Sequence, residues 1–390
     1  MTLAPEWPAI AGELTSWHHE ETVATAVPAL LRDRRVPLGG AAREAVLAAA
    51  EAVRTLDDEA AVDLTALAGA LLRSESVASS RIEHLDAGQR ELGLAMLRGM
   101  PVTGAAAQVA ANVRAMTAAI TAARADLPYH VVDLLHVHRL LLEADPYLGS
   151  WAGRLRTVQN WVGGAESTPH GAMFVPPAPA RVPALVADLV AFCNRRDVDP
   201  IAQAAIAHAQ FETIHPFADG NGRTGRTLVH VVLRRRGLAR RTVVPVSTVL
   251  LADVGGYFAG LGDYRDGRLD DWLVRFAAAA SRAAGAGRRL GDDLAGLHRH
   301  WLDAVRPRRG SAVARITDAL LRQPVVDIEA LRPLASGVAD KNIYAAVDRL
   351  CEAGVLTELS GGGRNRVWAA GGVLDLLDGF ENRLGPRGRL

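Results

Sequence analysis

The stretch His215-Pro-Phe-Ala-Asp-Gly-Asn-Gly-Arg-Thr-Gly-Arg226 decides how this chain folds. One apolar run, residues 201–214, precedes it, and a second, residues 227–233, follows it. Both runs predict helices with buried faces. Pro216 ends the first helix, because proline lacks an N–H donor and disfavours helical geometry in the residue before it. The stretch is therefore expected to be a loop between two buried helices.

The loop combines glycines and arginines in a pattern typical of anion sites. Gly220 and Gly222 allow a tight turn whose N–H groups reach a ligand without a Cβ in the way. The next helix is expected to begin near Arg223, so its free N–H groups and positive dipole end point at the same place. Arg223 and Arg226 share a helix face, and both can grip phosphate oxygens. Phosphate is the anion that this pattern favours.

Two further side chains of the loop suit phosphate chemistry. Asp219 offers a hard oxygen ligand for Mg²⁺. His215 is a residue type whose ordinary pKa suits proton transfer at neutral pH. The residues alone therefore predict a nucleoside triphosphate held by the loop, with a base beside it.

Two plainer interpretations stay open at this point. The loop can be a structural turn, since a glycine-rich loop before a helix is weak evidence of binding. His208, Glu212 and His215 can also form a zinc site, because residues four apart lie on one helix face. Pro216 interrupts the helix at the third zinc ligand, so a buried histidine with a supporting carboxylate is favoured over zinc.

The stretch resembles the signature of the Fic family, His-Pro-Phe-x-Asp/Glu-Gly-Asn-Gly-Arg-x-x-Arg, and matches it at every fixed position. Fic proteins are mostly AMP transferases, which move AMP from ATP to a protein hydroxyl and release pyrophosphate. The resemblance covers roughly residues 15–280 and implies a Fic-type helical bundle, ATP as substrate and Mg²⁺ as cofactor. It implies His215 as the catalytic base, Asp219 as the metal ligand, and phosphate contacts from Gly220, Asn221, Gly222, Arg223, Thr224, Gly225 and Arg226.

A second segment resembles the Fic flap, a short hairpin that covers the active site. Residues 158–164 read Val-Gln-Asn-Trp-Val-Gly-Gly, and residues 173–177 read Met-Phe-Val-Pro-Pro. Val162, Gly163 and Gly164 are the expected flap residues, and the two glycines allow a tight turn. An edge strand of such a hairpin can pair with an extended target peptide. An ordinary surface hairpin is the alternative.

Ser79 and Glu83 resemble the inhibitory helix that many Fic proteins carry. That motif reads Ser/Thr-x-x-x-Glu-Gly/Asn, and its glutamate reaches the second arginine of the signature. Here His84 stands in place of the Gly or Asn, so a different helix end is expected. Without the resemblance, the same residues are a plain helix end on the surface.

The resemblance also implies which residues lie beside the adenine base of ATP. Fic proteins often stack the base near an aromatic pair, which makes Tyr257 and Phe258 the candidates, although a core role is nearly as favoured. Some members have an asparagine seven residues after the second aromatic residue, and here that position holds Arg265.

Composition and spacing set the domain organisation. The apolar fraction of 49% is enough for large cores, and the formal net charge of +1 gives no overall signal for nucleic acid. Residues 1–40 look irregular because of their prolines, whereas segments with helical spacing begin at residue 41. The expected domains are an N-terminal helical region at 1–100, a Fic catalytic domain at 101–284, a linker or helix at 285–310 and a winged-helix-like domain at 311–390.

The last of these domains rests on its own pattern. Three helices, over residues 312–321, 327–334 and 340–353, precede a hairpin over residues 355–359 and 366–369. This order resembles a winged helix-turn-helix, in which the third helix faces the DNA major groove. Lys341 would then contact DNA, and Arg364 and Arg366 would lie on the wing. Contact with a protein instead of DNA stays open.

The sequence therefore predicts a mainly α-helical protein adenylyltransferase that acts on a Ser, Thr or Tyr hydroxyl. A nucleotide-sensing transcription regulator, a Fic enzyme for another nucleotide and a de-AMPylating enzyme are the alternatives. No apolar run long enough for a membrane span and no signal peptide are evident. Cys193 and Cys351 are too few and too distant for a disulfide framework, which suits a cytoplasmic location. A homodimer is left open.

Overall fold

The computed structural model describes residues 7–16, 22–58, 64–97, 103–165, 168–335, 337–360 and 366–384. It is mainly helical, as the sequence predicts, and its contacts divide the chain into two compact units. Unit 1 comprises Met1–Val53, Arg114–Arg240 and Asp253–Ser281. Unit 2 comprises Arg54–Val113, Arg241–Ala252 and Arg282–Leu390. The domain boundaries expected at residues 100, 284 and 310 stay a prediction.

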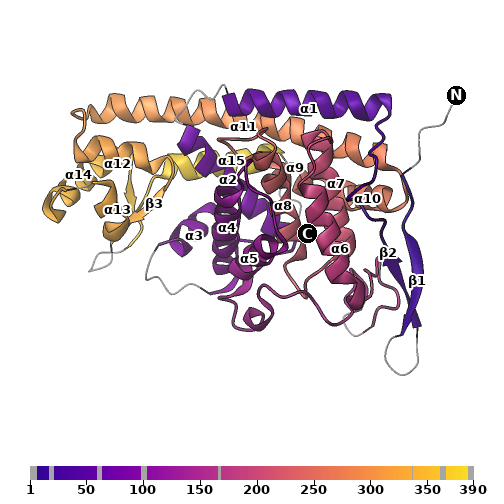
Figure 1. The fold of residues 1–390 in the computed structure, drawn as a ribbon. Helices are drawn as coiled ribbons and strands as arrows, with labels where there is room; N and C mark the ends of the chain where they lie inside the picture. The colour runs from indigo at the N-terminus through magenta and orange to yellow at the C-terminus, as the bar shows by residue number, and fades with distance from the viewer. Residues whose placement is uncertain are drawn as a thin grey trace. The chain divides into compact units, whose positions relative to one another are not determined.

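Unit 1 is built around the helices α7 (Pro200–Ile214) and α8 (Asn221–Arg235), which pack against each other (Figure 1). Three helices are divided between the two units: α1 (Gly40–Asp58), α4 (Gly104–Ala122) and α11 (Leu269–Val305). The elements that lie wholly in unit 1 are β1 (Ala11–Ser16), β2 (Thr22–Val27), α5 (Val131–Leu142), η2 (Gly149–Trp151), η3 (Pro179–Arg181), α6 (Val182–Cys193), α7 (Pro200–Ile214), α8 (Asn221–Arg235) and α10 (Val254–Arg265).

Helix α7 forms the centre of unit 1. The residues Ile201–Ile214 are all buried, and the helix packs against α6, α8 and α10. Its start follows from local chemistry, because the Asp199 carboxylate accepts a hydrogen bond from the N–H of Ile201 at 2.8 Å and Pro200 fills the first turn. The two helices predicted on either side of the loop are thus confirmed. The second, α8, begins at Asn221, slightly earlier than expected.

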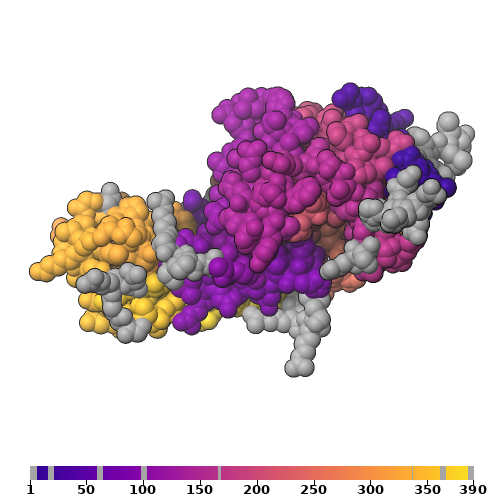
Figure 2. Space-filling view, turned by 90° about the horizontal axis from the view of Figure 1, so that it is seen from below, coloured from indigo at the N-terminus to yellow at the C-terminus, as the bar shows by residue number. Residues whose placement is uncertain are grey.

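The expectation that residues 1–40 are irregular is wrong. β1 and β2 form an antiparallel hairpin in which Ala11 pairs with Val27 and Ser16 with Thr22 (Figure 1). The sequence of β2, Thr-Val-Ala-Thr-Ala-Val, consists mostly of residues that favour strands. Ala26 donates its N–H to the Val175 carbonyl at 3.0 Å, so β2 lies beside the second arm of the flap. Figure 2 shows the indigo hairpin against pink residues of the same unit.

Unit 2 contains three groups of elements, which are separate in the sequence. The first group is α2 (Leu64–Arg81) and α3 (Gln89–Ala95), and the second is α9 (Val246–Ala252). The third comprises α12 (Ala312–Leu320), β3 (Val325–Asp327), α13 (Ile328–Leu334), α14 (Asp340–Glu352), β4 (Thr357–Glu358), β5 (Val367–Ala369) and α15 (Gly371–Leu384). The last helix, α15, packs against α2, α3 and α9.

The three helices and the hairpin predicted for the C-terminal module are present, and two elements were missed. β3 joins the hairpin to give a three-stranded antiparallel sheet in the order β3-β5-β4, and α15 follows it. Arg364 lies outside the described residues, and the winged-helix assignment stays a prediction. Within the described residues, no helix is long and apolar enough to span a membrane.

Most of the segment 285–310, expected to be a linker or a helix, belongs to helix α11. The helix continues to Val305 through four glycines. A Cβ on Gly287 would lie 3.3 Å from side-chain atoms of Leu56 and Leu71, and one on Gly291 would lie 3.3 Å from Leu67. These two glycines therefore allow close packing inside unit 2 rather than breaking the helix.

A buried ionic cluster fixes the end of α2. Glu381 of α15 accepts hydrogen bonds from the Arg81 guanidinium and from Gln89 Nε2, the latter at 2.6 Å. Arg73 donates to the Gln89 carbonyl at 3.1 Å. Burial raises the pKa of Glu381, and the positive charge of Arg81 opposes that shift. Removal of one member would leave a buried charge without its partner, which is costly.

His84 lets α2 end in the way that a glycine would. The N–H of Leu85 bonds to the Ser80 carbonyl at 3.1 Å and the N–H of His84 to the Arg81 carbonyl at 2.9 Å, which is the Schellman pattern. His84 takes the left-handed position of this motif, with φ 61°. The different helix end expected from a histidine here is therefore wrong, and the backbone strain falls on His84 instead.

We predict that His84→Gly stabilises the protein. A non-glycine residue in the left-handed region costs about 1–2 kcal/mol, and the entropy that glycine loses on folding offsets roughly half of this gain. Urea unfolding followed by circular dichroism should give a free energy of unfolding higher by up to about 1 kcal/mol. Ala353, which also ends a helix but has φ −81°, is the control, because Ala353→Gly relieves no strain and should lower stability. Equal effects of the two changes would contradict the prediction.

Candidate functional site

The loop between α7 and α8 places His215 in a strained conformation. His215 ends α7 with φ 47° and ψ 61°, in the left-handed region that histidine seldom adopts. Its N–H bonds to the Phe211 carbonyl at 2.8 Å. Such strain persists only where surrounding contacts hold the backbone.

Arg156 supplies most of those contacts. Its Nε donates to the His215 carbonyl at 2.9 Å, and its other guanidinium nitrogens donate to the carbonyls of Ile214, Val158 and Pro177. Its own N–H bonds to the Pro216 carbonyl at 2.9 Å. Arg156 is only 2% exposed, and burial lowers its pKa to about 10. One buried guanidinium thus joins the loop to both ends of the flap.

Asn160 determines which nitrogen of His215 carries the lone pair. Its amide nitrogen lies 2.9 Å from the Phe217 carbonyl, which can only accept, so this nitrogen is the donor. The same amide nitrogen lies 2.9 Å from His215 Nδ1. Nδ1 therefore accepts, and a neutral His215 holds its proton on Nε2.

His215 is neutral in the folded protein at ordinary pH. The residue as a whole is half-buried, but its imidazole is enclosed, and burial is the first cause of a pKa lowered to about 3. The positive charges of Arg156 and Arg265 lower it further. A neutral imidazole has one lone pair with which to accept a proton.

His138 of α5 supports the loop from another side. Its Nδ1 accepts the N–H of Gly153 at 2.9 Å, so its Nε2 donates to the Asp219 carbonyl at 2.9 Å. Its ring stacks on Phe217, with centroids 3.7 Å apart and planes 3° apart. Burial lowers the pKa of His138 to about 4, which keeps this donor–acceptor pattern at neutral pH.

The start of α8 has the geometry of an anion site. Gly220 caps the helix with φ 72°, and a Cβ there would lie 3.0 Å from Leu141. Asn221 holds the loop closed, since its amide bonds to both the N–H and the carbonyl of Phe217 at 2.9 Å. The other predicted phosphate residues lie in the first two turns of α8, where free N–H groups favour anions: Gly222, Arg223, Thr224, Gly225 and Arg226.

Asp219 suits a magnesium ligand. Its side chain is exposed, and its Oδ1 accepts the N–H of Gly220 at 2.6 Å. Mg²⁺ is usually held by one or two carboxylates together with substrate phosphates, so a single carboxylate beside an anion site fits this ion. The zinc interpretation is not supported, because among the described residues no three His, Cys, Asp or Glu side chains lie close enough to hold a metal.

The adenine-side candidates differ from each other in exposure. Tyr257 is 2% exposed, and its hydroxyl bonds to His208 Nε2 at 2.9 Å, so it has a core role. Phe258 is 44% exposed and remains the candidate that a base could contact. The hydrogen bond with Tyr257 also gives a structural role to His208, one of the residues in the zinc interpretation.

The flap forms, but with less pairing than a hairpin. Its two arms meet in one antiparallel bridge, in which Val162 donates to the Phe174 carbonyl at 2.9 Å and Met173 to the Val162 carbonyl at 2.9 Å. Gly163 and Gly164 follow with φ 71° and 79°, which confirms the expected turn. A pocket of about 400 Å³ lies along the first arm, and Asn160, Trp161 and Ala218 help to line it.

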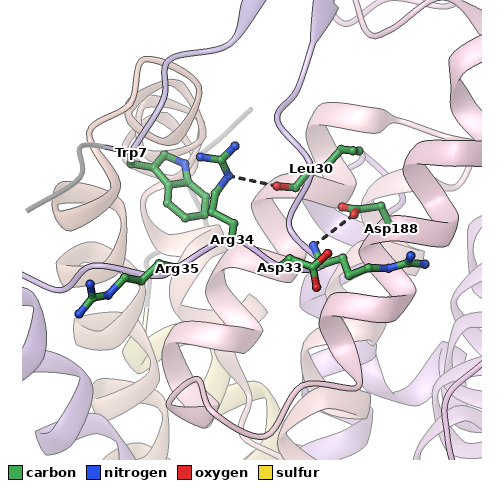
Figure 3. Close-up of a pocket in the computed structure, with 7 residues that line it drawn as sticks. Trp7, Leu30, Asp33, Arg34, Arg35 and Asp188 are labelled. Atoms are coloured by element: carbon green, nitrogen blue, oxygen red, sulfur yellow. Dashed lines mark hydrogen bonds between the residues drawn. The ribbon is translucent and has the colours of Figure 1, made fainter.

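Another pocket of unit 1 does not offer a site. It has a volume of about 490 Å³ and includes Trp7, Arg34, Arg35 and Asp188 among its walls. Figure 3 shows Arg34 beside Trp7 and Arg35 pointing away from them. The Asp188 carboxylate is already bonded to the N–H of Leu31 at 2.6 Å. Side chains that diverge in this way do not converge on one ligand.

Comparisons with known proteins show similarity around the loop. A model of the Fic/DOC family matches residues 128–233, which include the loop and α8. The protein adenylyltransferase fic-1 of Caenorhabditis briggsae is 37% identical over 156 residues. Residues 128–233 of this chain are therefore similar to the Fic family. The match covers 39% of this chain and 27% of that relative, so the chain spans about a quarter of the relative's length.

Two further comparisons agree with this family. A probable protein adenylyltransferase of Aquifex aeolicus is 45% identical over 69 residues, 17% of this chain and 22% of the relative. The crystal structure of a Fic family protein from Desulfovibrio desulfuricans G20 gives a TM-score of 0.54 at 21% identity, over 86% of this chain and 97% of that one. The latter shows likeness of fold alone.

Sequence reasoning missed Arg156, Asn160 and His138. Arg156 and Asn160 lie 59 and 55 residues before His215, and His138 lies 81 residues before Asp219. No local pattern links such positions. The sequence signal that could have indicated Arg156 is its position just before the flap segment, residues 158–164.

We predict that Gly225→Ala destabilises unit 1. A Cβ at this helical glycine would lie 2.3 Å from Glu212 Oε1 and 2.8 Å from the Phe211 ring, so α7 and α8 would have to move apart. Overpacking of this kind costs about 1–3 kcal/mol. Urea unfolding measures the loss. Gly262→Ala is the matched control, because a Cβ there meets nothing within 4 Å, and it should be neutral or slightly stabilising. Wild-type stability of Gly225→Ala would show that the close approach is not needed.

Proposed function

We propose that this chain belongs to the Fic family and is a protein adenylyltransferase, which transfers AMP from ATP to a Ser, Thr or Tyr hydroxyl of a target protein. The observation that carries the proposal is a neutral imidazole, His215, held beside the N-terminus of α8. The names of the relatives, protein adenylyltransferases, support the same reaction.

In this proposal His215 is the general base. Nδ1 carries the lone pair, so it takes the proton of the target hydroxyl in place of its contact with Asn160. The hydroxyl oxygen forms a bond to the α-phosphorus, the bond between the α- and β-phosphates breaks, and pyrophosphate leaves. Free N–H groups at the start of α8, with Arg223 and Arg226, hold the phosphates. Mg²⁺ bound at Asp219 would offset charge on the leaving pyrophosphate.

The flap is proposed to present the target. The bridge between Val162 and Phe174 uses few main-chain groups, so the arms can offer others to an extended peptide. The proteins that bind there, a cytoplasmic location and a homodimer remain expectations.

For the C-terminal module, we favour a protein partner over DNA. Arg332 pairs with Asp340 at 2.8 Å, and Arg366 pairs with Glu358 at 2.7 Å. DNA affinity depends mainly on basic side chains that are available for phosphates, and here acids already occupy these two.

The central test uses ATP labelled at the α- or the γ-phosphate, with Mg²⁺ and a cell lysate as the source of targets. We expect protein labelling only from the α position. His215→Ala should abolish labelling and leave ATP binding, measured by calorimetry, nearly intact, because the base lies beside the phosphate site. Labelling from the γ position would indicate a kinase, and full transfer by His215→Ala would remove His215 from the mechanism.

A second prediction concerns inhibition by Glu83. Ser79 is buried in α2, and Glu83 follows the end of this helix, where the Schellman motif holds the backbone. In the inhibitory motif that residues 79–83 resemble, the glutamate occupies the second arginine of the signature as a bidentate pair, and we propose from this resemblance that Glu83 restrains transfer in the same way. Glu83→Gly should raise auto-modification by about tenfold or more, because misplacement of the phosphates by about 1 Å can cost a hundredfold.

The control for this change is Glu91→Gln, which removes an acid elsewhere in unit 2. Glu91 lies in the first turn of α3 and bonds to the N–H of Gly88 at 3.1 Å. Its auto-modification rate should equal that of the wild type. Equal rates for wild type and Glu83→Gly, at matched folding, would show that residues 79–83 are a plain helix end.

A further inference from the structure

Arg265 joins the flap to the segment that carries His215. It is the last residue of α10, and its Cζ lies 3.7 Å from the centroid of the Phe174 ring in the flap. Its Nη2 lies 3.4 Å from the Glu212 carbonyl and its Nε lies 3.4 Å from Thr213 Oγ1. These two acceptors belong to the last turn of α7. One side chain thus contacts both the flap and the residues just before His215.

The charge of Arg265 is poorly compensated. Both of its hydrogen bonds are long, at 3.4 Å, and both acceptors are neutral oxygens. Burial lowers the pKa of Arg265 to about 10, and the charge of Glu212 opposes this only in part. A cation held in such surroundings acts over a longer range than an exposed one, because water screens it less.

The positive charge of Arg265 acts on His215. The charged groups that act on it are Arg156, from the segment before the flap, and Arg265, from α10. Nearby in the sequence, Glu212 precedes His215 on α7, and Asp219, Arg223 and Arg226 follow it in the loop and the first turns of α8. The guanidinium of Arg156 already donates hydrogen bonds to four backbone carbonyls. The planar guanidinium of Arg265 is thus available to the flap, and its positive charge is available to His215.

We propose that Arg265 is a positioning residue for the transfer reaction, whose planar guanidinium sets the flap through Phe174 and whose positive charge faces His215. The inference rests on the proposed function. The planar guanidinium holds the second arm of the flap where the target must lie, and this affects target binding. The charge disfavours protonated His215, which keeps the base ready at lower pH.

Three variants separate the two roles. Arg265→Met removes the charge and keeps a long side chain, whereas Arg265→Lys keeps the charge and loses the plane. Phe174→Leu removes the ring and leaves Arg265 unchanged. Transfer from α-labelled ATP to a purified target, or to the protein itself, is measured as kcat and KM from pH 8 down to about pH 2.5, so that the acid limb of His215 lies inside the range. Arg268→Met is the matched control, since Arg268 is about half exposed and pairs with Asp263 and Asp266 instead.

The expected results differ between the variants. Arg265→Met should move the acid limb of the kcat/KM profile to higher pH by about one unit, because loss of a nearby cation raises the pKa of His215. Arg265→Lys and Phe174→Leu should leave this limb in place and raise KM for the target several-fold. Arg268→Met should match the wild type. Loss of activity by Arg265→Met with an unmoved limb would overturn the electrostatic role, and an unchanged KM in both other variants would overturn the flap role.

A measurement without turnover separates this proposal from the proposed function. NMR titration of isotope-labelled histidine should show His215 with a higher pKa in Arg265→Met than in the wild type. If wild type transfers no α-label but this shift is present, the proposed function fails and the charge role of Arg265 stands. If α-label is transferred and no shift appears, the charge role fails alone. Should Arg265→Met not fold, Arg265→Gln replaces it in both measurements.

Discussion

The contacts of the Arg156 guanidinium with backbone carbonyls are the constraint on which the site depends. A left-handed histidine followed by proline does not hold its conformation unaided, and the carbonyls of Ile214 and His215 need donors once α7 has ended. Arg156 meets both needs at once. Because its other nitrogens bond to Val158 and Pro177, the conformation of the loop and the spacing of the two flap arms are set by the same side chain.

Around this contact, polar side chains hydrogen-bond to the backbone of the loop. His138 and Asn160 donate to the carbonyls of Asp219 and Phe217, and Asn221 bonds to both main-chain groups of Phe217. These side chains thus satisfy backbone groups of the loop. The free N–H groups at the start of α8 suit a ligand that carries several negative charges.

Sequence reasoning reached the parts of this site that are local. The helix, loop and helix around residues 215–226 could be predicted, because proline, glycine and apolar runs act on their immediate neighbours. The role of Arg156 could not, since its acceptors lie far along the chain. The β1–β2 hairpin was missed because prolines obscured a strand pattern, and residues 285–310 stayed open between a linker and a helix because close packing at glycines cannot be read from the sequence. His84 shows the reverse case, in which the surrounding helix end imposes a backbone conformation that the residue itself disfavours.

The contact between Glu381 and Arg81 has a consequence for the order in which the protein assembles during synthesis. The two residues are 300 positions apart, and at about 5–20 residues per second a ribosome needs roughly 15–60 s to deliver the second after the first. Every segment of unit 1 has been made by residue 281, whereas unit 2 gains α15 only afterwards. Throughout that interval the end of α2 carries an arginine whose buried partner does not yet exist. The helix that bears Ser79 is therefore among the last parts of the chain to reach its final surroundings.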